Sequence, residues 1–332
     1  MSKRFYSIVG SPVPRAYRFV YDNSIFIDNE CFRDTCCLVI FFSQDASVNW
    51  EELLFETGRT LNGDNAELEA KWMIEEVSGV KDSDDYKEQA KPIQLKRLNS
   101  LIERRVAGEP LQYVLGRWQF RELDLFVDDR VLIPRPETEI LVGYALEECA
   151  SKKSDLDLTQ SLNVVDLGCG SGAIGLSIVR ETQNVSVWCT DISEGAISVT
   201  RANLAGLGMA GQRVSVSQGS WFEALPEEML GKFDIIISNP PYIGDSEELP
   251  IEVSEWEPSS SLRSGPLGTE DLSFLLNNSI EWMSTEGLLI LELAPMQADA
   301  MVKEAKNLNY REVQLQHDLT GRERVLMAKK PL

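Results

Sequence analysis

Val164-Val165-Asp166-Leu167-Gly168-Cys169-Gly170-Ser171-Gly172 is the stretch that decides the fold of this chain. A buried strand runs directly into a glycine-rich turn, and a helical segment follows from Ala173. Glycines let the backbone bend sharply and come close to a ligand. Asp191 ends the next strand-like run, where a carboxylate can accept hydrogen bonds from a ribose diol. This order of elements predicts a nucleoside-binding site.

Short apolar runs alternate with helical segments from Leu162 onward. Ser193 and Thr269 are predicted helix N-caps within this region. The alternation is typical of an α/β fold with a parallel sheet covered on both faces, in which ligands bind at the carboxyl ends of the strands. The predicted strands are 163–166, 186–190, 213–217, 233–238, 287–292, 311–316 and 324–328.

Ser238-Asn239-Pro240-Pro241-Tyr242 follows one of these strands directly. Two prolines cannot continue a sheet ladder, so they hold the chain in an extended turn. The Asn239 amide and the Pro240 carbonyl then offer two acceptors that suit an incoming NH2 group, with Tyr242 as a flat apolar wall. A proline-stiffened loop with an incidental Asn explains the motif equally well in isolation. Its place at the same end of the sheet as the glycine turn favours the binding site.

Residues 46–115 have helical periodicity and predict a small helical bundle. Asp64 and Glu67 predict a capping box at the start of one helix. The apolar faces of two helices are formed by Ala66, Ala70, Met73, Ile74 and Val77, and by Leu95, Leu98, Leu101 and Ile102.

Three further segments complete the organisation. Residues 1–45 lack periodicity and cluster three cysteines, so we expect an atypical extension, disordered or loosely docked, that is dispensable for folding and activity. Residues 116–160 contain a predicted hairpin (118–120 with 123–127), a helix through Leu146 and a polar linker at 151–160. Residues 161–332 form the predicted ligand-binding domain.

Composition excludes several classes of function. The 332 residues contain 32 Lys and Arg against 53 Asp and Glu, a net charge of −21 that disfavours nucleic-acid binding. The single histidine, His317, excludes catalytic sites with His elsewhere in the chain and metal sites built on two His. Six cysteines without a CxxC pair predict no metal site and reduced thiols, as in the cytoplasm. No apolar run reaches 18 residues, which predicts no membrane span.

The glycine motif, Asp191 and Asn239-Pro240-Pro241-Tyr242 together resemble an S-adenosylmethionine-dependent class I methyltransferase that acts on a planar amide or amino nitrogen. The runs GEPLQYVLGRWQF (108–120) and LIPRPETEILV (132–142) resemble, more specifically, the glutamine N5-methyltransferases that modify the Gly-Gly-Gln loop of peptide-chain release factors. The resemblance covers roughly residues 48–330. It implies a Rossmann-like domain with a seven-stranded, mostly parallel sheet, preceded by a helical substrate-recognition domain.

The resemblance also implies a role for each matching position. S-adenosylmethionine, which leaves as S-adenosylhomocysteine, would be bound by Gly168, Cys169, Gly170, Ser171, Gly172, Asp191, Trp221 and Asn239. The substrate glutamine would be held by Asn239, Pro240, Pro241 and Tyr242, with Asn239 and Pro240 catalytic. Arg135, Pro136, Glu137 and Glu139 would shape the roof of the pocket. The chain departs from the family at Ser220, where an acidic residue is common.

Other interpretations stay open at this point. The same chemistry suits a ribosomal-protein glutamine, or adenine N6 in a flipped-out base. Gly170-x-Gly172-x-x-Gly175 alone also permits an NAD-dependent oxidoreductase, although no histidine is placed for hydride transfer. We expect a monomeric cytoplasmic enzyme whose partners are release factors, without membrane or direct nucleic-acid binding. A mitochondrial location stays open as the alternative, although a presequence is Arg-rich and acid-poor, whereas this N-terminus balances its basic residues with acidic ones.

Overall fold

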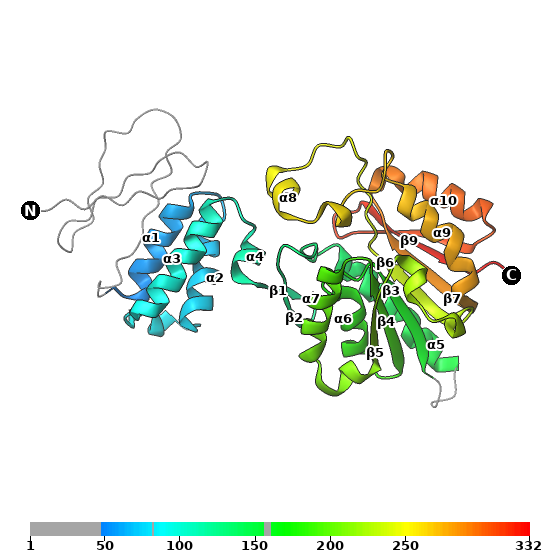
Figure 1. Cartoon of the computed structure of the whole chain (residues 1–332), viewed down its shortest axis with the longest axis horizontal. Helices are drawn as coiled ribbons and strands as arrows, with labels where there is room; N and C mark the ends of the chain where they lie inside the picture. The colour runs from blue at the N-terminus through cyan, green and yellow to red at the C-terminus, as the bar shows by residue number, and fades with distance from the viewer. Residues whose placement is uncertain (1–47, 82, 156–160) are drawn as a thin grey trace, which may run out of the picture. The chain divides into compact units, whose positions relative to one another are not determined.

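The computed structural model describes residues 48–81, 83–155 and 161–332, so the expectation for residues 1–45 lies outside the described chain. The chain separates into two compact units between Leu115 and Gly116 (Figure 1). No helix of the described ranges is both long and apolar enough to cross a membrane.

The first unit is helical. Its core contains Trp50 and Leu53 together with the two apolar faces predicted for residues 66–77 and 95–102, and both faces are confirmed as buried. Asn49 caps the first helix, because its Oδ1 accepts the Glu52 N–H at 2.9 Å. The elements are α1 (Trp50–Leu61), α2 (Ala66–Ser78), the 3₁₀ helix η1 (Ser83–Lys87), α3 (Pro92–Val106) and α4 (Leu111–Leu115).

The predicted capping box is wrong. Helix α2 begins at Ala66 after Asn65, and no side chain caps it. A backbone turn replaces the box, because the Ala66 N–H donates to the Gly63 carbonyl at 3.1 Å and the Glu69 N–H to that of Asn65 at 2.9 Å. The tight turn after α1 thus moves the helix start two residues past Asp64.

The second unit opens with the predicted hairpin, which is confirmed as antiparallel strands β1 (Arg117–Phe120) and β2 (Leu123–Phe126). Helix α5 (Thr138–Asp155) follows and continues past Ser151, so the predicted start of the linker is wrong. Lys152 lies 3.6 Å from the Glu148 carboxylate one turn earlier and donates to the Glu286 carbonyl at 2.6 Å. These contacts hold the last turns of α5 in helical form.

A seven-stranded sheet forms the centre of this unit, in the order β5-β4-β3-β6-β7-β9-β8. The five strands from β5 to β7 are parallel, and β9 is antiparallel to both of its neighbours. All seven predicted strands and the mostly parallel α/β architecture are confirmed. The strands are β3 (Leu162–Leu167), β4 (Val185–Asp191), β5 (Val214–Gln218), β6 (Phe233–Ser238), β7 (Met283–Glu292), β8 (Arg311–His317) and β9 (Glu323–Lys329).

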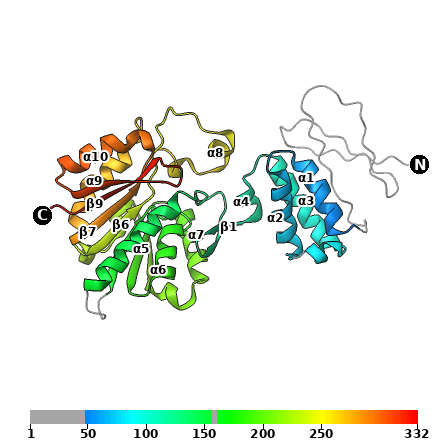
Figure 2. The ribbon, with the colours of Figure 1, turned by 180° about the vertical axis from the view of Figure 1, so that it is seen from behind.

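Helices cover both faces of the sheet, and Figure 2 shows the unit from behind. Val165 and Leu167 of β3 belong to one core with the buried faces of α9 and α10, whereas Val164 points to the opposite face in the strand alternation. The longer helices are α6 (Ala173–Glu181), α7 (Glu194–Ala205), α9 (Glu270–Trp282) and α10 (Ala298–Asn307). Shorter turns are η2 (Gly208–Arg213), η3 (Trp221–Ala224), η4 (Glu227–Met229), α8 (Ile251–Trp256), η5 (Ser259–Ser261) and η6 (Pro295–Gln297).

The two predicted N-caps differ in outcome. Ser193 is confirmed, since its Oγ accepts the Ala196 N–H at 3.2 Å. Thr269 lies at the N-cap position of α9, but its side chain makes no capping bond. The Asp271 N–H in the first turn donates instead to the Ser264 hydroxyl at 2.8 Å, so Ser264 takes over the role expected of the Thr269 hydroxyl.

The order of strands determines where a ligand can bind. The chain moves outward from β3 to β4 and β5, then returns to place β6 on the other side of β3. This switch point leaves the carboxyl ends of β3 and β6 side by side. The glycine turn and the Asn239 turn therefore lie next to each other, and the Ser238 hydroxyl donates to the Leu167 carbonyl at 2.6 Å across the pair.

Candidate functional site

The glycine turn is fixed by its backbone. The N–H groups of Gly168 and Cys169 both donate to the Thr190 carbonyl, at 2.8 and 2.9 Å. Gly168 has a φ of +73°, a conformation that side chains disfavour, and a Cβ there would lie 3.5 Å from the Trp221 ring. A glycine at this position lets the turn and the indole come together at the end of β3.

The remaining residues of the turn are anchored by α7. The Thr200 hydroxyl donates to the Gly170 carbonyl at 2.8 Å, and its Oγ1 lies 3.4 Å from the buried Cys169 thiol. The Asn203 amide donates to the Ser171 carbonyl at 2.8 Å. Side chains of α7 therefore fix the turn from the side that faces this helix, and a ligand would approach from the opposite side.

Asp191 contacts the same turn from the end of β4. Its Oδ2 accepts the Gly170 N–H at 2.9 Å, and its Oδ1 accepts the Ser193 N–H at 2.9 Å. Burial raises the pKa of this carboxyl, while the N–H donors of Ser193 and Gly170 act in the opposite direction. Each oxygen keeps acceptor capacity for further hydroxyl groups, as the prediction for Asp191 requires.

Trp221 forms the side of this cradle. It begins η3 with a φ of +47°, which is rare for a bulky side chain and persists only where the surroundings enforce it. Its ring also lies 6.5 Å from that of Phe274, tilted by 33°. The contact of the adenine with Trp221 stays a prediction, as does the effect of Ser220 beside it.

Asp166 of β3 is a site residue that sequence reasoning missed. It is fully buried, and its Oδ2 accepts the Gly175 N–H at 2.9 Å at the start of α6. Its Oδ1 has no partner among the described residues. Burial raises the pKa of Asp166 to about 7, with a further contribution from Asp191. A buried carboxyl with one unpaired oxygen therefore lies in the strand that leads into the glycine turn.

These features fit the cofactor expected from the sequence. A Cβ built on Gly170 would meet nothing within 4 Å, so the space beside this residue is open. Asp191 and the Trp221 ring lie beside this turn. Carboxylate acceptors with an aromatic wall suit the amine, hydroxyl and ring groups of S-adenosylmethionine. The described residues contain no cluster of His, Cys, Asp or Glu that is arranged to hold a metal ion.

The Asn239 turn has a different construction. The Asn239 Nδ2 donates to the Thr138 hydroxyl at 3.1 Å, and Thr138 donates in turn to the Glu292 carboxylate at 2.7 Å. The Tyr242 hydroxyl donates to the other oxygen of Glu292 at 3.3 Å. Within the described chain, no hydrogen bond reaches the Pro240 carbonyl or the Asn239 Oδ1. Two acceptors are therefore available where the sequence predicts the substrate nitrogen.

Thr138 and Glu292 are two further site residues that sequence reasoning missed. Both are buried, at 4% and 1% exposure. Burial raises the pKa of Glu292 to about 7, although the Thr138 hydroxyl and the charge of Arg324 lower it. The only sequence signal was their position, since Glu292 ends a predicted strand and Thr138 lies inside the predicted roof segment.

The predicted roof residues make several separate contacts. Arg135 forms an ion pair with the buried Glu257 at 2.5 Å, and the Ile133 N–H donates to the same carboxylate at 3.2 Å. Glu139 accepts the Arg121 N–H at 3.0 Å in the β1–β2 turn. Pro136 and Glu139 line a hollow of about 340 Å³ with Arg121, Ile140, Gly143, Tyr144, Glu147 and Leu319. The role of Arg135, Pro136, Glu137 and Glu139 as a roof stays a prediction.

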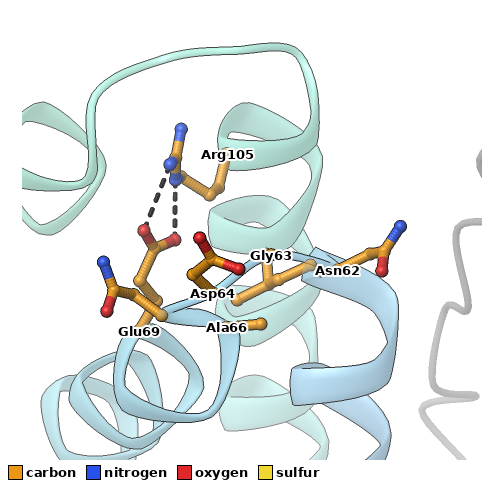
Figure 3. Close-up of a pocket in the computed structure, with 8 residues that line it drawn as sticks. Asn62, Gly63, Asp64, Ala66, Glu69 and Arg105 are labelled. Carbon is orange, nitrogen blue, oxygen red and sulfur yellow. Dashed lines mark hydrogen bonds and ion pairs between the residues drawn. The ribbon is translucent and has the colours of Figure 1, made fainter.

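A smaller hollow of about 180 Å³ lies in the helical unit (Figure 3). Asn62, Gly63, Asp64 and Ala66 line it, and Arg105 faces Glu69 across it with contacts of 2.7 and 3.1 Å. None of the predicted site residues lines this hollow.

Comparison with known proteins matches both units. Residues 52–116 match the PrmC N-terminal domain, and residues 153–253 match the Methyltransferase small domain. The bifunctional methyltransferase of Rickettsia prowazekii is 34% identical over 72% of this chain and 48% of its own length. A solved protein-(glutamine-N5) methyltransferase (release factor-specific) from Alicyclobacillus acidocaldarius has 23% identity and a TM-score of 0.35, over 60% of this chain and 95% of that one.

Two relatives are matched over most of their length. The release factor glutamine methyltransferase of Rhodopirellula baltica is 40% identical over 69% of this chain and 77% of that protein. The protein of the same name from Gloeobacter violaceus is 34% identical over 84% of this chain and 95% of that protein. The chain therefore belongs to the release factor glutamine methyltransferase family.

Proposed function

We propose that this protein transfers a methyl group from S-adenosylmethionine to the side-chain amide nitrogen of the glutamine in the Gly-Gly-Gln loop of peptide-chain release factors. The observation that carries this proposal is the pair of available acceptors, Asn239 Oδ1 and the Pro240 carbonyl, beside the glycine turn. The names of the relatives from Rhodopirellula baltica and Gloeobacter violaceus support release factors as the substrate class.

The chemistry demands an oriented nitrogen more than it demands a base. An amide nitrogen is a poor nucleophile, and S-adenosylmethionine supplies a methyl group on a good sulfonium leaving group. Asn239 Oδ1 and the Pro240 carbonyl accept the two N–H bonds of the glutamine amide, which aims its nitrogen and stabilises the positive charge that develops there. Tyr242 packs against the amide plane, and the extra proton leaves to solvent after transfer.

The cofactor roles follow the geometry of the other turn. Gly168, Cys169, Gly170, Ser171 and Gly172 line the methionine and ribose portions with their backbone. Asp191 holds the ribose hydroxyls, and Trp221 packs near the adenine.

Three assignments extend the proposal. The helical domain of residues 46–115 recognises the release factor, and the enzyme acts in the cytoplasm as a monomer. The net charge of −21 favours a protein substrate over a nucleic acid.

Methylation assays with parallel substrates test this function. The purified protein is incubated with labelled S-adenosylmethionine and one of three substrates: a release factor, duplex DNA or ribosomal RNA. We expect label only in the release factor, and none in a release factor whose loop glutamine is replaced by Ala. Label in either nucleic acid, or equal label in the glutamine variant, would overturn the proposal.

A further inference from the structure

Behind the Asn239 turn lies a buried chain of hydrogen bonds that joins three distant elements. Asn239 follows β6, Thr138 begins α5, and Glu292 ends β7. The Asn239 Nδ2–Thr138 Oγ1 distance is 3.1 Å and the Thr138 Oγ1–Glu292 Oε2 distance is 2.7 Å. The series of hydrogen bonds ends at Tyr242, whose hydroxyl donates to Glu292 Oε1 at 3.3 Å. Every link is a side chain, so its direction depends on which atoms carry protons.

The available protons allow only one donor-to-acceptor direction along this chain of hydrogen bonds. An ionised carboxylate only accepts hydrogen bonds, so the single Thr138 hydroxyl proton is used on Glu292. The Thr138 oxygen can then only accept, and the NH2 group is the only part of the Asn239 amide that can donate to it. The Asn239 Oδ1 is consequently turned away from Thr138, and no described residue donates to it.

We propose that Thr138 and Glu292 are positioning residues, which fix the Asn239 amide so that its oxygen, and not its NH2 group, faces the substrate nitrogen. This inference rests on the proposed function, because it assumes that the substrate presents N–H donors at Asn239. A reversed amide would set its own donors against those of the substrate, with loss of the hydrogen bond that orients the nucleophile.

When Glu292 is protonated, the hydrogen bonds between Asn239, Thr138 and Glu292 can form in either donor-to-acceptor direction. A neutral carboxyl can donate to Thr138, which then donates to Asn239 Oδ1 and turns the amide around. The groups that face Glu292 are Thr138 on α5, Tyr242 after β6, Arg324 on β9 and Glu137 before α5. Burial is the largest influence and raises the pKa of Glu292 to about 7, so the reversal falls within an accessible pH range.

Kinetics of matched variants test the positioning role. Glu292→Gln keeps the size of the side chain and its two hydrogen-bonding atoms. Because one of these atoms is now a donor, the hydrogen bonds to Thr138 and Asn239 can form in either direction. We expect kcat to fall about tenfold at pH 8, with S-adenosylmethionine affinity within about twofold of wild type. In wild type kcat should fall about tenfold from pH 8 to pH 6, because the pKa lies near 7, and Glu292→Gln should lose this acid limb. Glu286→Gln, on an exposed carboxyl of the same strand, should behave as wild type.

Variants of Thr138 test whether both residues act through one chain. Thr138→Val removes both hydrogen bonds and should lower kcat about tenfold, whereas Thr138→Ser should restore most of it. Ser177→Ala, which removes a buried hydroxyl without a described partner, controls for the loss of a hydroxyl. The Thr138→Val/Glu292→Gln double variant should be no slower than the slower single variant. Additive losses, or full kcat with an intact acid limb in Glu292→Gln, would overturn the proposal.

A spectroscopic measurement tests the chain independently of any substrate. With ¹⁵N-labelled asparagine, the side-chain NH2 signal of Asn239 is assigned by its absence in Asn239→Asp. We expect this signal to titrate near pH 7 in wild type and to stay constant in Glu292→Gln. A constant signal in wild type would contradict the chain. A titrating signal in a protein that does not methylate release factors would instead refute the proposed function and leave the chain standing.

Discussion

The two turns at the carboxyl edge of the sheet are held in place by different means. The cofactor turn is held through its own backbone groups: the Asp191 carboxylate accepts the Gly170 N–H, the Thr200 hydroxyl donates to the Gly170 carbonyl, and the Thr190 carbonyl accepts two further N–H groups. The substrate turn is held by side chains, because Asn239 rests on Thr138 and Thr138 on Glu292. Substitutions within the cofactor turn leave these backbone groups in place, whereas the orientation of the Asn239 amide depends on the side chains of Thr138 and Glu292 and on their protonation.

The largest expected effect is that of Asn239→Ala, which should impair the substrate turn and leave the cofactor turn intact. In Asn239→Ala we expect methyl transfer to fall on the order of 10² or more, because the group that orients the nucleophile is lost. S-adenosylmethionine affinity should change less than about twofold, as measured by calorimetry. Near-normal turnover in a folded Asn239→Ala protein would contradict the assignment of this turn to the substrate.

A second effect compares the buried carboxyl of each half. The pKa values of Asp166 and Glu292 are both raised to about 7 by burial. A carboxyl with a raised pKa contributes stability that is complete below its unfolded pKa and is lost as the pH rises through the folded value. The free energy of unfolding should therefore fall by about 3 kcal/mol per group between about pH 4 and pH 7.

Denaturant titrations of two variants measure these contributions. Asp166→Asn and Glu292→Gln should each flatten the pH dependence of stability by their own share. The two shares should add, because the groups belong to separate hydrogen-bond chains. An unchanged slope in both variants would show that neither carboxyl titrates in this range.

The smallest of the three effects has the opposite pattern to the first, with a loss of cofactor affinity and little loss of turnover. In Asp191→Ala we expect S-adenosylmethionine affinity to fall about tenfold, since charge-assisted hydrogen bonds to the ribose are lost. Turnover at saturating cofactor should drop far less than in Asn239→Ala. Asp245→Ala, an exposed acidic residue after the Asn239 turn, serves as the control. Cofactor binding as tight as in wild type would remove Asp191 from the site.

The same contrast explains what could be predicted from the sequence. Asp191 and Gly170 lie 21 residues apart, and a strand, a glycine turn and an acid at the next strand end form a local pattern. Asn239 and Thr138 lie 101 residues apart, and Thr138 and Glu292 lie 154 apart. No local pattern reports such a contact, because it exists only after the sheet has brought β6 and β7 beside the start of α5.

Errors in the helices have a similar origin. The apolar faces of α2 and α3 follow from periodicity and were predictable, as were the seven strands. The starts of α2 and α9 were not, because a backbone turn replaced the box at Asp64 and the Ser264 hydroxyl replaced the Thr269 hydroxyl. The unpaired Asp166 Oδ1 could not be predicted either, because the hydrogen-bond partners of a buried side chain are known only once the neighbouring elements are placed.

The central claim is that this edge of the sheet methylates a glutamine amide. The most direct test is tandem mass spectrometry of a release factor after incubation with the protein and S-adenosylmethionine, with Asn239→Ala as the control. We predict one added methyl group on the side chain of the Gly-Gly-Gln glutamine, greatly reduced with Asn239→Ala. A methyl group on any other residue, or equal modification by the variant, would contradict the account.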